Sequence, residues 1–322
     1  MTIAICMYLM LYWLLFLSFI TLGRVLFNSF VGDDFGYISH PFITNQNFLG
    51  LFIGSSADLG GSSQVTAHFY RPLMLLVFSF IDFLFGENAF AYHLVSLLFH
   101  IVNGVLIFKL FRKLTNSTLA FLTSLLFLVH PISVETYAYA SNLQDLLFTF
   151  FGLLAFTFSL KKITVIRFGI ILFLLLCSLL SKETGIIFLI LVPFYLWHFL
   201  KEHNIYRYLS FLGILVLYLF IRVAIAKVTI TTVALSPIGT LSLLDRIKII
   251  PQIFFYYLSS IIFSLKQAIG QVWLAADLNI YAVFASQLLF ILLIFLGLRL
   301  KKEQKRVFIF FACWFLLGII PH

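Results

Sequence analysis

The sequence predicts an all-α, polytopic membrane protein with about nine spanning helices. Of its 322 residues, 62% are hydrophobic and only 10% are charged, whereas soluble domains carry about 25% charged residues. A globule of this size could not hide so much apolar surface from water, so most of it must face lipid. A succession of apolar runs, separated by short polar connectors, is the other observation that favours this class.

The apolar runs begin at the N-terminus. Thr2 to Leu22 has the length of a membrane helix and lacks a small-x-small cleavage site, so it predicts a retained anchor rather than a signal peptide. Further apolar runs follow at 72–86, 91–111, 119–131, 137–160, 168–180, 184–200, 208–225, 250–265, 280–298 and 307–320. We expect all of them except 72–86 and 250–265 to cross the membrane.

The distribution of charges predicts this topology, because cytoplasmic loops concentrate Lys and Arg. Of the 21 basic residues, 13 lie in four short connectors, at 109–113, 161–167, 201–207 and 299–306. The alternation requires 72–86 and 250–265 to be re-entrant or interfacial, inside two long outer loops at 24–90 and 223–279. Arg24 is a mild exception on the outer side. The net charge of +9 therefore reflects cytoplasmic loops and does not indicate nucleic-acid binding.

Ionisable groups at the edge of a membrane are costly, so each is a functional candidate. Asp33 and Asp34 are adjacent in the first outer loop, where neighbouring carboxylates repel each other, and such a pair suits a general base or a metal ligand. A solvated turn with a helix N-cap is the alternative. Arg71, just before Pro72, could hold a phosphate by two hydrogen bonds or could snorkel at the interface.

A polar stripe is predicted on the helix that begins near residue 91. His93, Ser96, His100 and Asn103 share one helix face. The two histidines lie about 10.5 Å apart along the axis and cannot share a metal ion. We interpret the stripe as interhelical hydrogen bonding, with His93 as the member that could reach a ligand. Asp145 should face the bundle, toward His100 or Asn103, in a structural network.

Two outer corners carry further polar residues. His130-Pro-Ile-Ser-Val-Glu135 ends one helix and starts the next, and the role of Glu135 stays open between structure and function. Lys182 and Glu183 form a tight corner between two apolar runs. Two interpretations of this corner stay open. It could be a local ion pair or a helix cap, or Lys182 could be a cation for an anionic headgroup.

Together and in order, these motifs resemble the membrane part of the transmembrane-TPR protein O-mannosyltransferases and their bacterial relatives. These are glycosyltransferase family 39-like members of the GT-C superfamily of polyprenyl-phosphate-sugar glycosyltransferases. The motifs are Asp33-Asp34, Tyr70-Arg71-Pro72-Leu73, His93, His100-x-x-Asn103, His130-Pro-x-x-x-Glu135, Asp145-Leu-Leu and Ser181-Lys182-Glu183-Thr184-Gly185. The resemblance implies one GT-C-like transmembrane domain over 1–322, which we expect to be incomplete at its C-terminus.

The resemblance also implies a reaction. A mannose-like hexose would move, with inversion, from a polyprenyl-phosphate donor to a protein Ser/Thr or glycan hydroxyl at the outer membrane face. Asp33 or Asp34 would be the base, and Arg71 and Lys182 would bind the lipid phosphate. Supporting roles are implied for Tyr70, His93, His130, Glu135, Asp145 and Glu183. Arginine and lysine can meet the phosphate charge, so no metal cofactor is required, although a divalent metal ion stays an open alternative.

The chain departs from the family pattern at one site motif. Relatives often carry an Arg shortly before the position of Asp145, where this chain reads Ser-Asn-Leu-Gln, so Asn142 or Gln144 would have to fill that role. Two other functions stay in view. One is a GT-C enzyme with a lipid or cell-wall glycan acceptor, and the other is a membrane transporter or non-enzymatic scaffold. A transporter predicts inverted sequence repeats, and none is found.

Overall fold

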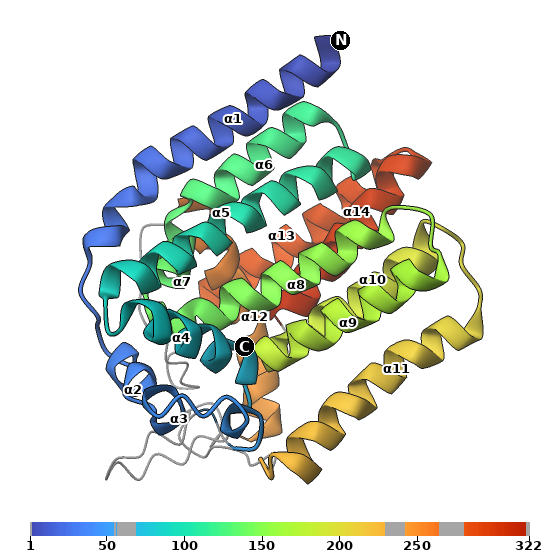
Figure 1. Ribbon diagram of the computed structural model, residues 1–322. Helices are drawn as coiled ribbons and strands as arrows, with labels where there is room; N and C mark the ends of the chain where they lie inside the picture. Colours follow the sequence, from blue (N-terminus) through green and yellow to red (C-terminus); the bar gives the residue numbers. More distant parts are fainter. Residues whose placement is uncertain (1, 55, 57–68, 229–241, 264–279, 320–322) are drawn as a thin grey trace. The chain divides into compact units, whose positions relative to one another are not determined.

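The computed structural model describes residues 2–54, 56, 69–228, 242–263 and 280–319, and the regular elements in these residues are all helical (Figure 1). The predicted all-α class is therefore confirmed. The chain divides into two compact units, Met1–Thr229 and Ile230–His322. The candidate site lies within the first unit.

The first unit is built from long helices joined by short helical turns. The long helices are α1 (Thr2–Leu22), α4 (Pro72–Phe85), α5 (Ala89–Leu114), α6 (Ser117–Val129), α8 (Leu143–Ser159), α9 (Val165–Ser181), α10 (Ile186–His198) and α11 (Ile205–Phe220). The short elements are η1 (Gly23–Phe27), α2 (Asp34–Ile38), α3 (Pro41–Thr44), η2 (Gly50–Phe52), η3 (Pro131–Ser133), α7 (Val134–Ala138), η4 (Ala140–Asn142), η5 (Glu183–Gly185) and the π-helical turn η6 (Ile221–Ile225). The second unit contains α12 (Leu243–Phe263), α13 (Ile280–Arg299) and α14 (Lys302–Ile319).

Several described helices are long and apolar enough to cross a membrane. Three qualify alone: Ala89–Leu114, Ala140–Ser159 and Ile205–Ile225. Ser117–Val129 and Pro131–Ala138, bent by 52°, make a fourth if they are one broken span. The 17 residues of α9 reach only about 26 Å, against a hydrocarbon core of about 30 Å. The protein is therefore a membrane protein by its apolar helices, whereas nine spans and re-entrant outer segments stay predictions.

Two helix breaks divide the apolar runs differently from the hydropathy pattern. The run 119–131 yields α6, which ends at Val129 because His130 precedes a proline and takes an extended conformation (φ −69°, ψ 133°). The run 137–160 is not one helix, since the extended Tyr139 (φ −97°, ψ 125°) separates α7 from η4 and α8. These breaks create the corner where the polar residues of the site gather.

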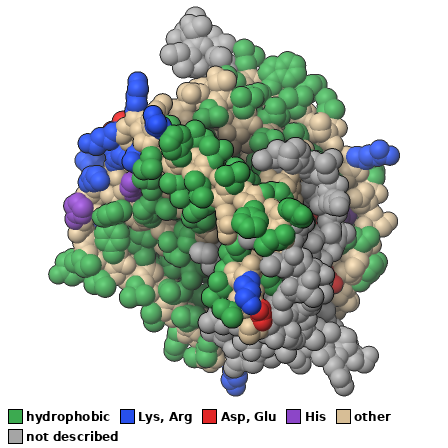
Figure 2. Space-filling model, turned by 180° about the vertical axis from the view of Figure 1, so that it is seen from behind, with side chains coloured by type: hydrophobic (Ala, Val, Ile, Leu, Met, Phe, Trp, Pro, Cys, Tyr) green, Lys and Arg blue, Asp and Glu red, His purple; other side chains and the backbone are tan. Residues whose placement is uncertain are grey.

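Buried apolar side chains hold the first unit together. Phe78 on α4, Tyr92 and Leu97 on α5 and Leu147 on α8 belong to its largest core cluster. By contrast, only 17% of the apolar window of Ile205–Ile225 is buried. Figure 2 shows hydrophobic side chains over much of the described surface. Such an apolar surface is expected of helices that face lipid.

Close helix contacts depend on two glycines. A Cβ on Gly152 of α8 would lie 2.0 Å from a ring atom of Phe188 on α10. A Cβ on Gly185 would lie 2.6 Å from the backbone of Ser178 on α9. The close approach of Gly185 places the η5 corner directly against α9, and this holds the backbone of the neighbouring Lys182 and Glu183 in position.

The polar residues of the first unit separate toward two ends of the helices. The connectors α5–α6, α8–α9 and α10–α11, which carry the basic residues, lie toward one end in Figure 1. The η5 corner, α2 and α3 lie toward the other. This separation is the arrangement that the charge pattern predicts for a cytoplasmic and an outer side.

Candidate active site

The predicted acidic pair occupies two different environments. Gly32, at φ +55°, makes the left-handed turn that leads into α2. Asp34 is fully buried, and its two carboxylate oxygens accept hydrogen bonds from the backbone N–H groups of Ser141, at 2.7 Å, and Val31, at 3.1 Å. Asp33 is exposed. Asp34 therefore ties the first outer loop to the start of α8, and Asp33 is the carboxylate that a substrate can reach.

Arg71 is buried rather than snorkelling. Its Nη1 donates to Oε1 of Gln144 at 2.6 Å, and its Nε lies 3.3 Å from Oε2 of Glu183. The guanidinium carbon lies 3.9 Å from the centre of the Phe69 ring, which is cation–π distance. Pro72 begins α4 directly after it. Arg71 thus joins the loop before α4 to both α8 and the η5 corner. That Asn142 or Gln144 fills the role of the missing family arginine stays a prediction.

Glu183 holds a second arginine that the sequence analysis missed. Its Oε1 accepts from Nη1 of Arg222 at 3.1 Å and from the backbone N–H of Tyr70 at 3.4 Å. Arg222 also donates to the Tyr218 hydroxyl at 3.1 Å and lies in the π-helical turn η6, a feature often found at functional sites. A single arginine inside the apolar run 208–225 was the available signal.

The arginine cluster, which we define as Arg71, Glu183 and Arg222, carries one more positive than negative charge. The side chains of both arginines are about one-tenth exposed, at 8% and 11%, and that of Glu183 is 31% exposed. In such a partly desolvated site, a bound anion would interact with the excess charge much more strongly than in water. The cluster can therefore hold a phosphate.

Tyr37 of α2 connects the acidic loop with this cluster. Burial raises the pKa of its hydroxyl, while the nearby Arg71 guanidinium, to which it is hydrogen bonded, opposes the increase. The charges of Asp33 and Glu183 also act on this hydroxyl. Tyr37 was not predicted as a site residue. Its hydroxyl is hydrogen bonded to Arg71 and lies within the influence of the Asp33 charge.

Tyr70 supports the arginine cluster from the other side. Its side chain is fully buried, and its hydroxyl donates to the backbone carbonyl of Phe52 at 3.1 Å. Burial raises its pKa to about 12, so the phenol stays protonated and neutral at physiological pH. It positions the loop and adds no charge to the site.

Lys182 and Glu183 do not pair with each other, so the local ion-pair interpretation is wrong. The Nζ of Lys182 lies 2.7 and 2.9 Å from the two carboxylate oxygens of Asp145. The side chains are partly exposed, at 23% and 28%. Lys182 directly follows α9 and Asp145 lies in the first turn of α8, so the pair joins the two helix ends and adds a third cation next to Glu183 of the arginine cluster.

The remaining predicted residues are His93, His130 and Glu135. His93 is fully buried at the start of α5, packed against Phe30 and near the Asp34 charge. His130 caps η3, since its Nδ1 accepts from the backbone N–H of Ile132 at 3.2 Å. Glu135 on α7 is exposed.

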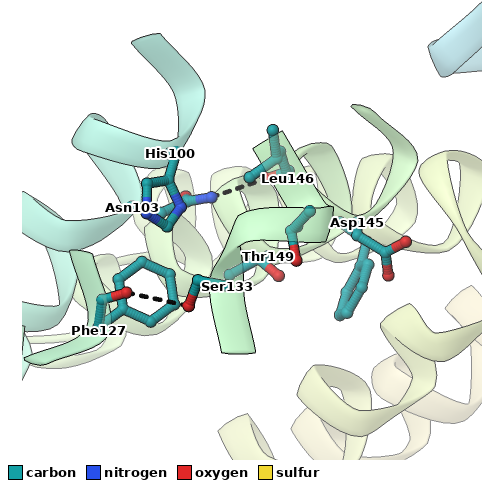
Figure 3. A pocket seen from close by; sticks show the side chains of 9 residues that line it. His100, Asn103, Phe127, Ser133, Asp145, Leu146 and Thr149 are labelled. Atoms are coloured by element: carbon teal, nitrogen blue, oxygen red, sulfur yellow. Dashed lines mark hydrogen bonds between the residues drawn. The ribbon is translucent and has the colours of Figure 1, made fainter. Parts of the chain in front are cut away.

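The lower part of the predicted stripe does bond between helices. Nε2 of His100 lies 3.1 Å from the Leu128 carbonyl on α6, and Nδ2 of Asn103 donates to the Leu146 carbonyl on α8 at 3.0 Å. A cavity of about 190 Å³ lies beside these two residues and extends to Asp145 (Figure 3). The interhelical interpretation is therefore confirmed, and Asp145 faces the bundle as expected, although its carboxylate pairs with Lys182.

No group of three or more His, Cys, Asp or Glu side chains among the described residues could hold a metal ion. The hydrogen bonds and charges described above are the basis for assigning the base and the cations.

Comparison with known proteins shows what part of this chain is similar to. Residues 70–226 match the profile of the dolichyl-phosphate-mannose-protein mannosyltransferase family. This stretch contains Arg71, Lys182, Glu183 and Arg222 but not Asp33 or Asp34. The predicted resemblance to GT-C mannosyltransferases is confirmed.

Individual relatives agree with the family match. Human protein O-mannosyl-transferase TMTC1 is 34% identical over 182 residues, which cover 51% of this chain and 21% of the human protein. A protein O-mannosyl-transferase of Caenorhabditis elegans is 29% identical over 184 residues, covering 53% of this chain and 26% of the relative. Human TMTC3 is 32% identical over 124 residues, covering 36% and 13%. The chain thus matches about a fifth of the length of its first relative, and no solved structure matches it.

Proposed function

We propose that this chain is a membrane hexosyltransferase that moves a mannose-like sugar from a polyprenyl-phosphate donor to a hydroxyl acceptor on the outer membrane face. The similarity of residues 70–226 to the mannosyltransferase family is the observation that carries the proposal. The names of the relatives favour a protein Ser or Thr as acceptor. The arginine cluster supplies the charge that such a donor requires.

Asp33 is the proposed base. Its exposed carboxylate takes the proton from the acceptor hydroxyl while the hydroxyl oxygen attacks the anomeric carbon of the sugar. The bond from that carbon to the phosphate oxygen breaks in the same displacement, and the electron pair leaves with the lipid phosphate. A single displacement inverts the anomeric configuration. Asp34 is a positioning residue, because backbone N–H groups already occupy both of its oxygens.

The departing phosphate gains charge during this step. Arg71 and Arg222 can stabilise it through planar guanidinium groups, which suit phosphate oxygens. Glu183 holds the two arginines in place and neutralises only one of their charges. Lys182, fixed by Asp145, adds a further cation. Because these groups are held before the donor binds, little reorganisation is needed in the transition state.

The test is transfer by the full chain reconstituted in lipid vesicles. Radiolabelled polyprenyl-phosphate mannose and glucose are offered with a Ser/Thr-rich peptide, a lipid or a glycan acceptor. We expect the wild type to transfer mannose to the peptide. Transfer only to the lipid or the glycan would show that the protein is a hexosyltransferase with a different acceptor from the one proposed.

Arg71→Ala should abolish transfer, and Arg207→Ala is its matched control. Arg207 pairs with Glu202 in the connector between α10 and α11, at the other end of the helices. The proposal fails if the wild type neither transfers nor hydrolyses either donor. It also fails if the two arginine variants have equal activity.

A further inference from the structure

The cavity beside α5 has a chemical character that the interhelical hydrogen bonds do not explain. It has a volume of about 190 Å³, the share of about six water molecules in the liquid at about 30 Å³ each. Six hydrogen-bonding side chains from α5, η3, α7 and α8 line it: His100, Asn103, Ser133, Thr136, Asp145 and Thr149. Figure 3 shows several of them around the same space.

Two buried atoms of its lining residues have no hydrogen-bond partner among the described residues. Nδ1 of His100 and Oδ1 of Asn103 make no hydrogen bond with any described residue, although the side chains are 1% and 0% exposed. Leaving a buried polar atom unsatisfied costs about 1–3 kcal/mol. The other polar atom of each side chain bonds to the Leu128 or Leu146 carbonyl, so both groups are fixed in orientation. His100 and Asn103 are therefore held in fixed positions beside the cavity.

The number and kind of lining groups indicate a ligand with several hydroxyls. A ligand with a single hydroxyl can donate one hydrogen bond and accept two. It would therefore leave most of the six polar lining side chains without a partner. Phe127, Leu146 and Phe148 complete the wall. A wall that combines aromatic rings with amide, hydroxyl and carboxylate groups suits a sugar ring, whose apolar C–H faces and polar edges need both kinds of partner.

The position of the cavity agrees with this chemistry. Asp145 lines it and is held by Lys182, one of the proposed phosphate-binding cations. A sugar in the cavity would have its phosphate beside that lysine. We infer that the cavity is the subsite for the single hexose ring of the donor. This inference rests on the proposed function and specifies which part of the site recognises the sugar.

The experiment compares binding of two lipids to the full chain in nanodiscs by calorimetry. One is a short-chain polyprenyl-phosphate mannose, and the other is the same polyprenyl phosphate without sugar. The wild type should bind the mannose lipid more tightly. Thr149→Val and Thr136→Val each remove one cavity hydroxyl with little change in volume and should lower this preference about three- to tenfold, as expected for one hydrogen bond. Their affinity for bare polyprenyl phosphate should not change.

Thr157→Val is the matched control, because Thr157 lies further along α8 and donates to the Leu153 carbonyl at 2.8 Å, away from the cavity. It should keep the wild-type preference. The subsite is refuted if the wild type does not distinguish the two lipids, or if both cavity variants keep the wild-type preference; water alone would then occupy the cavity. If the wild type binds neither lipid, the proposed function itself fails.

Discussion

Replacing Glu183 by glutamine tests the arginine cluster most specifically. Glu183 accepts hydrogen bonds from Arg71 at 3.3 Å, Arg222 at 3.1 Å and the Tyr70 backbone at 3.4 Å. Glutamine keeps only one acceptor oxygen, so one arginine must face an NH₂ donor. A lost charge-assisted hydrogen bond costs about 1.5–3 kcal/mol. Because Glu183 is 31% exposed, water screens part of this energy, and we expect a loss of about 1.5–2 kcal/mol.

The assay is thermal unfolding of the purified protein in detergent, followed by tryptophan fluorescence. The expected loss corresponds to a decrease in Tm of roughly 3–8 °C. Polyprenyl phosphate should raise the Tm of Glu183→Gln more than that of the wild type, because the anion then satisfies arginines that lack a carboxylate partner.

Glu303→Gln is the control for this variant. Glu303 pairs with Arg306 at 3.4 Å on α14, and its side chain is 80% exposed, so its removal should leave Tm unchanged. Equal Tm values for the two glutamine variants would mean that the Glu183 carboxylate does not stabilise the arginine cluster. An increase in Tm with polyprenyl phosphate that is the same in Glu183→Gln and in the wild type would lead to the same conclusion.

Three further changes test the positions of neighbouring residues by the same unfolding assay. Asp34→Asn leaves one acceptor for two backbone N–H groups and should cost about 2–3 kcal/mol; an unchanged Tm would contradict its structural role. Gly152→Ala places a Cβ 2.0 Å from a facing ring atom and should cost about 1–3 kcal/mol, whereas Gly213→Ala, with open space, should not. Lys182→Met should cost about 1–2 kcal/mol, and adding Asp145→Asn should recover stability; no recovery would mean that the pair does not couple.

The long helices were predictable because lipid selects for apolar residues over the whole length of a helix. The runs 91–111 and 208–225 correspond to α5 and to α11 with η6. The broken run 137–160 was not predictable, because Tyr139 is apolar enough to continue the run while its backbone is extended. Hydropathy reports the environment of a residue and not its backbone conformation.

The candidate site was partly predictable for a related reason. A charged residue next to an apolar run can be recognised in the sequence without knowing its partner, so Arg71, Lys182 and Glu183 were predicted as site residues. Their partners were not, because Lys182 and Asp145 are 37 residues apart and Glu183 and Arg222 are 39 apart. Adjacent Asp33 and Asp34 were treated as equivalent, yet helix α2 begins between them and buries only the second. Tertiary contacts decided each of these roles.

If Asp33 activates the acceptor hydroxyl, sugar transfer depends on its carboxylate. The decisive measurement is the initial rate of transfer from polyprenyl-phosphate mannose in vesicles, for wild type and Asp33→Asn at equal amounts of folded protein. Asp33 is exposed, so the variant should keep the wild-type Tm. We predict a decrease in rate of at least about a hundredfold, as expected for loss of a general base. Transfer by Asp33→Asn at the wild-type rate would contradict the account.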